Sequence, residues 1–291
     1  GRRQQRMNTA AAKSSFAHFS GLLKSEPVIV LESGSSMVLQ DWHFLQQMLA
    51  EQALVLSYDR PGIGLHSRST GDPAAASVTR NLEGLLSASE IQRPFVLVGY
   101  SLGGLYARHF AATHPDKVAA LVLIDPSPDH GDLIGPAAAA WVTCSAWIIH
   151  ALVRSGIARA VTKLAGLLMG KPQLDLPPSI RAFANLPHLR TVLREIRGFS
   201  QIQKQVSATP PAEPLPILCF SAGQRPKALT QGFDFSGHHA TLAAAGAAPL
   251  SRHLIVDRAS HASLLSNREN AETIGREMRA FMADLSLTSR S

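Results

Sequence analysis

Apolar positions in the first half of the chain fall into short runs that alternate with helix-like stretches. The runs end at Gly, Pro, Asp or Ser, which predicts buried strands. These strands are Pro27–Leu31, Ala53–Tyr58, Pro94–Val98 and Ala119–Ile124. Apolar residues at helical spacing lie between them, in Trp42–Ala53, Val78–Leu86 and Leu102–Thr113. Strands that alternate with helices predict an α/β fold, with a mostly parallel central sheet flanked by helices.

The pattern changes after residue 130. Leu133 to Gly170 is rich in alanine and reads as helical, and a polar helix is predicted from Thr191 to Val206. Prolines at 210–216 mark a boundary, after which Ile217–Phe220 and Arg252–Val256 read as strands and Asn270–Leu285 as a closing helix. We therefore predict a basic flexible tail (1–25), a core in two parts (26–130 and 213–291) and a helical cap inserted between them (131–212).

The net charge of +7 is unevenly distributed. Residues 1–25 hold five Lys or Arg and no acid, and residues 131–212 hold nine Lys or Arg against three acids, so the rest of the chain is net acidic. This distribution argues against a nucleic-acid-binding protein and predicts local surfaces for anions or anionic lipid. The N-terminal stretch has a composition typical of transit peptides, but we favour a solvated tail.

Two cysteines, Cys144 and Cys219, stand far apart in apolar surroundings. They suggest two buried thiols and no disulfide framework, so folding does not require an oxidising compartment. With 45% hydrophobic residues, the chain is long enough to bury a sizeable core. Metal-ligand spacings, a phosphate-binding loop and a dinucleotide fingerprint are all missing from the sequence, so we expect no cofactor and no metal.

The stretch Gly99-Tyr100-Ser101-Leu102-Gly103 stands between a predicted strand and a predicted helix. A Gly-x-Ser-x-Gly motif alone is a weak signal, but the strand–turn–helix context is what a serine nucleophile requires. The tight turn exposes Ser101 Oγ, and the helix N-terminus directs N–H groups to the place where an oxyanion would form. The alternative is an ordinary glycine-rich turn.

Five motifs in order, ESGSS, SYDRPGIG, VGYSLGG, LVLIDPSP and ASHASLL, make residues 26–287 resemble the serine esterases and lipases of the α/β-hydrolase fold. The resemblance implies that Ser101 is the nucleophile and that the backbone N–H groups of Leu102 and Ser35 form the oxyanion hole. Ser33-Gly34 stands where the family often has His-Gly, so Ser36 remains an alternative to Ser35. Asp59 in the second motif is expected to fix a loop by hydrogen bonds.

Among twelve histidines, His261 has the place that the general base needs. It follows the last predicted strand, precedes the last helix, and comes after both the serine and every candidate acid in the chain. An imidazole there can accept the Ser101 proton and pass it to the leaving group.

The acid is less obvious, because no carboxylate follows the strand ILCFSAG, where many members of the family carry it. Asp125, at the end of the preceding strand, is the residue that the resemblance favours. Alternatives are Asp234, Asp129, Asp257, or a Gln224 stand-in. We expect the acid to hold the second imidazole nitrogen and fix its tautomer.

Residues 133–153 contain no charged side chain and approach the length of a membrane span. A span would separate the strands before and after it, so we predict a cap helix, apolar toward the site. Its basic flank and two tryptophans suit peripheral membrane contact. We expect a cytoplasmic or peripheral membrane protein that cleaves carboxylic esters with an apolar part through an acyl-enzyme on Ser101. The alternative is a catalytically silent relative that binds a ligand or partner through its cap.

Overall fold

Seven strands form the centre of the molecule in the order β1-β3-β2-β4-β5-β6-β7. The computed structural model describes residues 16–21, 27–131, 135–171, 174–225 and 233–288. All neighbouring strands are parallel except β1, which runs antiparallel to β3. The strands are β1 Ala17–Ser20, β2 Val28–Glu32, β3 Leu54–Tyr58, β4 Phe95–Tyr100, β5 Val118–Ile124, β6 Ile217–Gln224 and β7 Arg252–Ser260.

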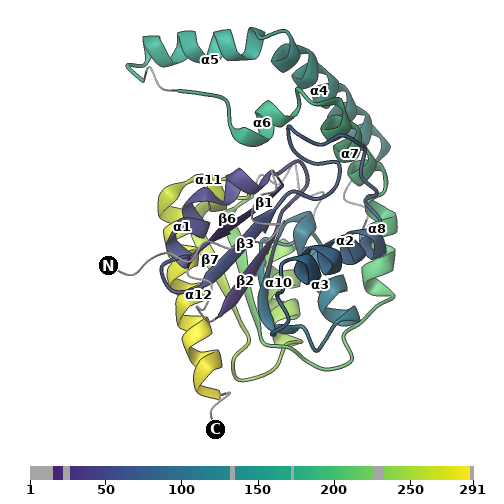
Figure 1. The fold of residues 1–291 in the computed structure, drawn as a ribbon, viewed down its shortest axis with the longest axis vertical. Helices are drawn as coiled ribbons and strands as arrows, with labels where there is room; N and C mark the ends of the chain where they lie inside the picture. Colours follow the sequence, from purple (N-terminus) through teal and green to yellow (C-terminus); the bar gives the residue numbers. More distant parts are fainter. Residues whose placement is uncertain (1–15, 22–26, 132–134, 172–173, 226–232, 289–291) are drawn as a thin grey trace.

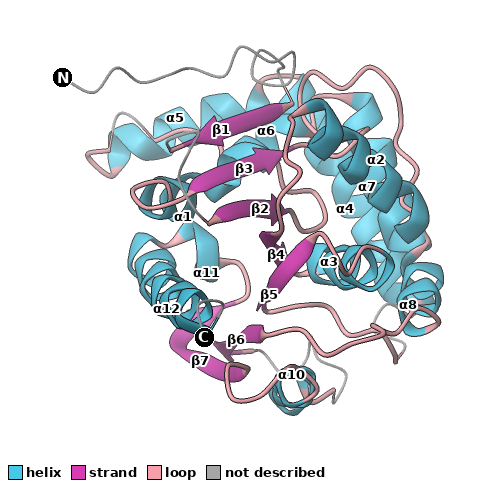
Figure 2. Ribbon diagram, turned by 60° about the horizontal axis from the view of Figure 1, so that its bottom comes forward, coloured by secondary structure: helices cyan, strands magenta, loops and turns pink. Residues whose placement is uncertain are grey.

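Helices cover both faces of this sheet (Figures 1 and 2). One face packs against α1, α11 and α12, and the other against α2, α3 and α10. Side chains alternate along each strand, so that in β2 Ile29 and Leu31 face the first layer while Val28 and Val30 face the second. The bounds of these helices are α1 His43–Leu49, α2 Ala75–Ala88, α3 Leu102–Thr113, α10 Phe235–Ala244, α11 Ser263–Ser266 and α12 Arg268–Thr288.

The cap is inserted between β5 and β6 and stands at the top of the molecule in Figure 1. It packs its own small core against loops that follow β2 and β3, through residues such as Val38, Ile63 and Leu189. Its helices are α4 Pro136–Arg154, α5 Ile157–Leu168, α6 Pro178–Ala182, α7 Leu186–Arg197 and α8 Phe199–Ser207. The predicted α/β architecture with a helical insertion is confirmed.

Several predicted boundaries were wrong. The helix predicted over 133–170 is interrupted at Gly156, which adopts a left-handed conformation at φ 81° and separates α4 from α5. The polar helix predicted over 191–206 is two helices, α7 and α8, which meet at Gly198. Part of the predicted flexible tail, Ala17–Ser20, forms β1, because Ala17 joins the apolar core beside β3. The rest of that tail, apart from Phe16 and Gly21, lies outside the described residues.

The two cysteines also differ from one another. Cys219 is buried in β6 as predicted, but Cys144 is exposed on α4. The prediction of a buried thiol at Cys144 was therefore wrong, because the surface of α4 that carries it has no protein packed against it among the described residues.

Candidate active site

Ser101 stands in a sharp turn between β4 and α3. Its backbone angles, φ 54° and ψ −122°, lie in a region that residues with a side chain rarely adopt. The turn brings backbones into close contact: a Cβ on Gly99 would meet Gly103 O at 2.5 Å, and one on Gly103 would meet Ser33 O at 2.6 Å. The two motif positions must therefore be glycine, because a Cβ at either one would clash with a backbone oxygen. The strained turn presents Ser101 at the start of the helix.

The structure brings Ser101, His261 and Asp125 into one hydrogen-bonded row. His261 Nε2 lies 3.0 Å from Ser101 Oγ, and His261 Nδ1 lies 2.5 Å from Asp125 Oδ2. His261 follows β7, and its ring stacks on Tyr100 with centroids 4.8 Å apart. Tyr100 also donates its hydroxyl proton to the His261 carbonyl oxygen at 2.7 Å, so one buried tyrosine fixes both the ring and the backbone of the histidine.

Asp125 is buried at the end of β5 and keeps its charge there. Burial alone would raise the pKa of this carboxyl, but the hydrogen bond and charge of His261, the Arg225 guanidinium and the Ala222 N–H outweigh it and hold the pKa at about 2. Ala222 N donates to Asp125 Oδ1 at 3.1 Å, and Arg225 forms an ion pair with Oδ2. Arg225 follows β6 directly, at the position where the sequence resemblance leads one to expect an acid.

The other candidate acids are engaged elsewhere. Asp129 accepts from Arg108 at 2.7 Å, and Asp234 accepts from Gly237 N at 3.0 Å as the N-cap of α10. Asp257 and Gln224 are exposed, on β7 and at the end of β6 respectively. Among the described residues, Asp125 supplies the carboxylate that contacts His261.

The predicted oxyanion groups lie on either side of Ser101. Leu102 is the first residue of α3, where a backbone N–H has no partner within the helix. On the other side, a Cβ on Gly34 would come within 3.2 Å of Ser101 Cβ, so the loop after β2 passes close to the serine. Ser35 is the next residue of that loop. Asp59 accepts from Leu39 N at 2.7 Å and thus fixes a neighbouring loop.

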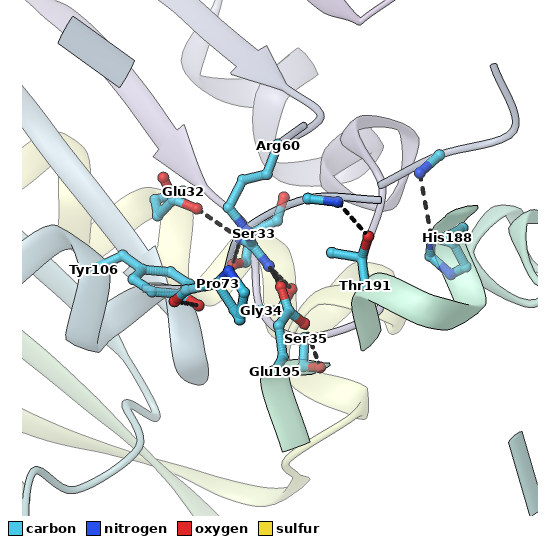
Figure 3. Close-up of polar contacts among 12 residues, drawn as sticks. Glu32, Ser33, Gly34, Ser35, Arg60, Pro73, Tyr106, His188, Thr191 and Glu195 are labelled. Carbon is cyan, nitrogen blue, oxygen red and sulfur yellow. Dashed lines mark hydrogen bonds and ion pairs between the residues drawn. The ribbon is translucent and has the colours of Figure 1, made fainter. Parts of the chain in front are cut away.

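A buried cluster of charges that the sequence analysis missed supports this loop (Figure 3). The guanidinium of Arg60, 4% exposed, donates to Glu32 Oε1 at 2.6 Å and to Glu195 Oε1 at 2.8 Å. The same group donates to the carbonyl oxygens of Ser33 and Gly34. Burial tends to lower the pKa of Arg60, but the two carboxylates outweigh it and raise the pKa well above its ordinary value. Arg60 is therefore a permanent cation beneath the loop.

Glu195 belongs to cap helix α7, which faces the core through three buried polar side chains (Figure 3). His188 accepts from Gly64 N at 3.2 Å, Thr191 accepts from Gly71 N at 2.9 Å, and Glu195 accepts from the Ser35 hydroxyl at 2.7 Å. The spacing of these residues is that of one helix face. Two signals could have found the cluster: the arginine inside the DRPGIG motif, and a lone glutamate at the end of an otherwise apolar strand.

An open cleft of about 1300 Å³ runs between the cap and the core beside this site. Tyr100 and Ala262, the chain neighbours of Ser101 and His261, are among its lining residues. Apolar and polar side chains both line its wall, and about half of the lining residues are polar. The apolar lining residues include Met37, Leu39, Phe44, Ile180 and Leu265, and the charged ones are Asp41 and Arg181.

One group of side chains has the composition of a metal site. Asp129, His130 and His238 bring ligand atoms within 4.8 Å of one another. Asp129 is already paired on both oxygens, with Arg108 at 2.7 Å and with His130 Nδ1 at 2.8 Å. The adjacent guanidinium would repel a bound cation, so we assign no metal to this group.

Comparison with known proteins identifies relatives of the chain. Residues 27–143 match a family described as alpha/beta hydrolase fold. The chain is 39% identical over 82 residues to the pimeloyl-[acyl-carrier protein] methyl ester esterase of Chromobacterium violaceum, covering 28% of this chain and 30% of that protein. It is 40% identical over 90 residues to Lipase LipV of Mycobacterium tuberculosis, covering 30% and 32%. The chain spans at most 39% of the length of the first curated relatives that it matches.

Solved structures resemble the chain over nearly its whole length. Cfl2 from Burkholderia cenocepacia superposes with a TM-score of 0.66 at 23% identity, covering 91% of this chain and 92% of that chain. A thermophilic esterase from Thermogutta terrifontis superposes with a TM-score of 0.62 at 18% identity, covering 92% and 93%. At these identities the likeness shows the fold alone. Sequence match and fold agree, and the chain has the α/β-hydrolase fold.

Proposed function

We propose that the protein is a serine hydrolase that cleaves carboxylic esters. The observation that carries this proposal is the row of hydrogen bonds from Ser101 Oγ through His261 to Asp125, with Ser101 at the start of α3. Two relatives of the chain are an esterase and a lipase, which agrees with this chemistry. A serine at the turn also argues against reactions that this fold performs with an aspartate nucleophile.

In the proposed reaction, Ser101 Oγ attacks the ester carbonyl carbon while His261 Nε2 takes the hydroxyl proton. The carbonyl oxygen becomes an oxyanion and accepts from Leu102 N–H and from Ser35 N–H, the neighbouring Ser36 N–H being the alternative second donor. His261 then protonates the departing alkoxide, leaving an acyl-enzyme. A water molecule, deprotonated by His261, attacks the acyl carbon, and the acid leaves as Ser101 regains its proton.

Asp125 holds His261 in the tautomer that the proposed reaction needs. A carboxylate at Nδ1 leaves Nε2 free to accept a proton, and its charge stabilises the imidazolium that forms. Since the pKa of Asp125 is about 2, the group stays ionised throughout the range in which the histidine works.

The substrate class follows from the cleft. Its apolar wall, with Met37, Leu39, Phe44 and Leu265 from the core and Ile180 from the cap, favours an apolar acyl or alcohol part. A volume of about 1300 Å³ exceeds what a small ester fills, so we propose a substrate with a long or bulky apolar group.

The test compares wild type with Ser101→Ala on p-nitrophenyl esters of short and long acyl chains, and with a fluorophosphonate that labels active serines. Wild type is expected to turn over the esters and to be labelled, while Ser101→Ala does neither. Ser266→Ala is the matched control, because Ser266 lies on the wall of the same cleft and its hydroxyl bonds only to a helix carbonyl. Equal turnover by Ser101→Ala would refute the proposal. Silence of the wild type on all esters would favour the alternative of a non-catalytic ligand-binding relative.

A further inference from the structure

The cap carries a broad apolar surface that the rest of the described chain leaves uncovered. On α4, Trp141, Ile148 and Leu152 are exposed at spacings of seven and four residues, which places them on one side of the helix. On α5 a second exposed row has helical spacing. We call these side chains together the outer cap face: Trp141, Ile148, Leu152, Ile157, Val161, Leu164 and Leu168.

The exposure is large for apolar groups. Trp141 is 71% exposed and Leu168 81%. The opposite side of α4 is held by the protein: Ala146 is buried, and His150 Nδ1 bonds to Phe183 O at 2.6 Å. The helix is therefore docked by one side and presents the other, and Figure 1 shows α5 at the end of the molecule far from the sheet. Single exposed apolar residues are common, but exposed rows on two neighbouring helices mark an interaction site.

Charge indicates what the outer cap face binds. Residues 133–174 contain no Asp or Glu, and four basic residues, Arg154, Arg159, Lys163 and Lys171, follow or flank the apolar rows, all of them exposed. On a helical wheel Lys163 lies about 130° from the centre of the α5 row and Arg159 lies nearly opposite that row. An apolar row with Lys and Arg on the remaining surface is typical of helices that lie in the interface of an anionic bilayer.

A second basic feature lies where α7 packs against α4. Arg190, Arg194 and Arg197 on α7 line a groove of about 410 Å³ together with Trp147, which projects from α4. Trp147 is itself 44% exposed. Three guanidinium groups beside an exposed indole suit the phosphate and carboxylate groups of anionic lipid heads, while the apolar rows suit the acyl boundary below them.

The helices are arranged to lie on a bilayer and not to cross it. By length and composition Ala137–Arg154 is the one helix among the described residues that could span a membrane. However, the strands before and after the cap, β5 and β6, are direct neighbours in one sheet. The twelve residues of α5 extend about 18 Å, well short of the ~30 Å hydrocarbon core. We propose that the outer cap face docks the protein on an anionic membrane surface.

Co-sedimentation of the full chain with vesicles tests this docking, and the assay needs no catalytic activity. Wild type is expected to bind vesicles of phosphatidylcholine and phosphatidylserine in equal parts, to bind phosphatidylcholine alone weakly, and to dissociate as salt rises. Leu164→Ser with Leu168→Ser should weaken binding by about tenfold for each leucine. Because both side chains are exposed, the melting temperature should not fall. Replacing Arg190, Arg194 and Arg197 by Gln should weaken binding to the anionic vesicles only.

The control is a charge change elsewhere, Arg268→Gln with Arg276→Gln, two exposed positions on α12, which packs against the sheet and is not part of the cap. It should bind like wild type. Absence of binding to either vesicle, or equal binding by the leucine variant, would overturn the proposal. Sedimentation velocity without lipid tests whether a second copy of the chain covers this face instead. A dimer that dissociates in the leucine variant would show that the outer cap face is a contact between copies and would overturn the proposal.

A separate observation concerns α7. Glu195 is a cap residue that reaches the loop after β2, and three consecutive residues of that loop are held by the Arg60–Glu195 pair: Ser33 and Gly34 by their carbonyl oxygens and Ser35 by its hydroxyl. Resting on the proposed function, we infer that Glu195 and Arg60 are positioning residues that fix the oxyanion loop only while α7 is docked. Cap position and oxyanion-hole geometry are then coupled.

The test separates positioning from docking. Glu195→Gln keeps the shape but removes the charge, and it should lower kcat by about 10- to 100-fold with KM little changed, since a small misplacement of an oxyanion donor has effects of this size. Thr191→Val is the matched control: it removes another buried bond from α7, to Gly71, and should lower the melting temperature but not kcat. A loss of kcat in Glu195→Gln no larger than in Thr191→Val would refute the inference.

Two further measurements keep this test decisive. Ser35→Ala should lower kcat modestly. Combined with Glu195→Gln it should lower kcat little further, because both changes affect the same hydrogen bond, from the Ser35 hydroxyl to Glu195. Amide hydrogen exchange of the segment 33–35 does not depend on turnover. It should become faster in Glu195→Gln and stay unchanged in Thr191→Val, and the opposite result would refute the coupling even if the protein cleaves no ester.

Discussion

Replacing Asp125 by Asn tests the assignment of the acid most directly. The change keeps the size of the side chain but removes the charge that faces His261 Nδ1 at 2.5 Å. An amide there presents either a neutral oxygen or an N–H group to the imidazole, so the tautomer with a free Nε2 loses its support. Loss of the acid from a serine–histidine pair lowers kcat about 10⁴-fold. Arg225 already shares Asp125 Oδ2, which weakens the pull of this carboxylate on the ring.

We therefore expect a decrease in kcat of about 10³-fold, equivalent to ~4 kcal/mol of transition-state stabilisation. The assay is p-nitrophenyl ester turnover, with the fluorophosphonate labelling rate as a second reading of Ser101 reactivity. Asp234→Asn is the control, since Asp234 caps α10 at an exposed position: kcat should be unchanged and stability lower by at most ~1 kcal/mol. A loss below tenfold in Asp125→Asn, or a larger loss in Asp234→Asn, would show that the reasoning is wrong.

The pH dependence of stability offers an independent check on the same residue. The folded pKa of Asp125 is about 2 and its ordinary value is 3.8, so the folded state binds the proton less readily than the unfolded chain. The ionised group thus contributes stability, about 2 kcal/mol, that is complete above the unfolded pKa and is lost as pH falls toward 2. Wild type should unfold at higher urea than Asp125→Asn at pH 6, and the difference should shrink as the buffer is made more acidic.

Other positions give sharp expectations. Gly34→Ala should reduce kcat at least 10²-fold, because the new methyl group would press on the Tyr100 ring that holds His261 and on Ser101 Cβ. Gly84→Ala, in open space on α2, should leave kcat unchanged and raise stability by up to ~1 kcal/mol. Burial raises the pKa of Asp59 to about 7, so its charged form destabilises the fold as pH rises through that value. Asp59→Asn, which keeps an acceptor for Leu39 N, should raise the melting temperature by about 2–4 °C at pH 8 and leave it unchanged at pH 4, as thermal unfolding at both pH values will show.

The fold could be predicted from the sequence where local pattern decides structure. Continuous apolar runs such as Val28–Leu31 are buried on both faces, which is what parallel strands between two helix layers require. The Ser101 turn was predictable because its signal is local: a strand, the Gly-x-Ser-x-Gly motif and a helix follow one another, and Gly99 is required by its contact with Gly103 O. By contrast, β1 has four residues and one fully buried side chain, too little for a pattern to detect.

The part that the sequence could not reveal is polar and depends on distant contacts. Thr191 and Glu195 read as the solvent face of a polar helix, yet both are buried, because their partners come from loops more than a hundred residues earlier. A prediction from hydrophobic periodicity treats polar side chains as exposed to solvent. It fails where two polar surfaces pack together and bury one another. Arg225 is a similar case: the sequence shows an empty acid position after β6, and only the fold reveals that its side chain reaches the acid on β5.

Energetics explain why such a cluster points to function. Burying Arg60 with Glu32 and Glu195 costs several kcal/mol of lost hydration for each ion, and buried ion pairs of this kind are often no more stable than apolar residues of equal volume. Stability alone therefore gives little reason for three charges here. What an apolar substitute could not do is donate to the Ser33 and Gly34 carbonyl oxygens and so fix the backbone beside Ser101. In the proposed hydrolase, the fold accepts the cost of these charges at the loop whose N–H groups would hold the oxyanion, so that these groups are aimed before an ester binds.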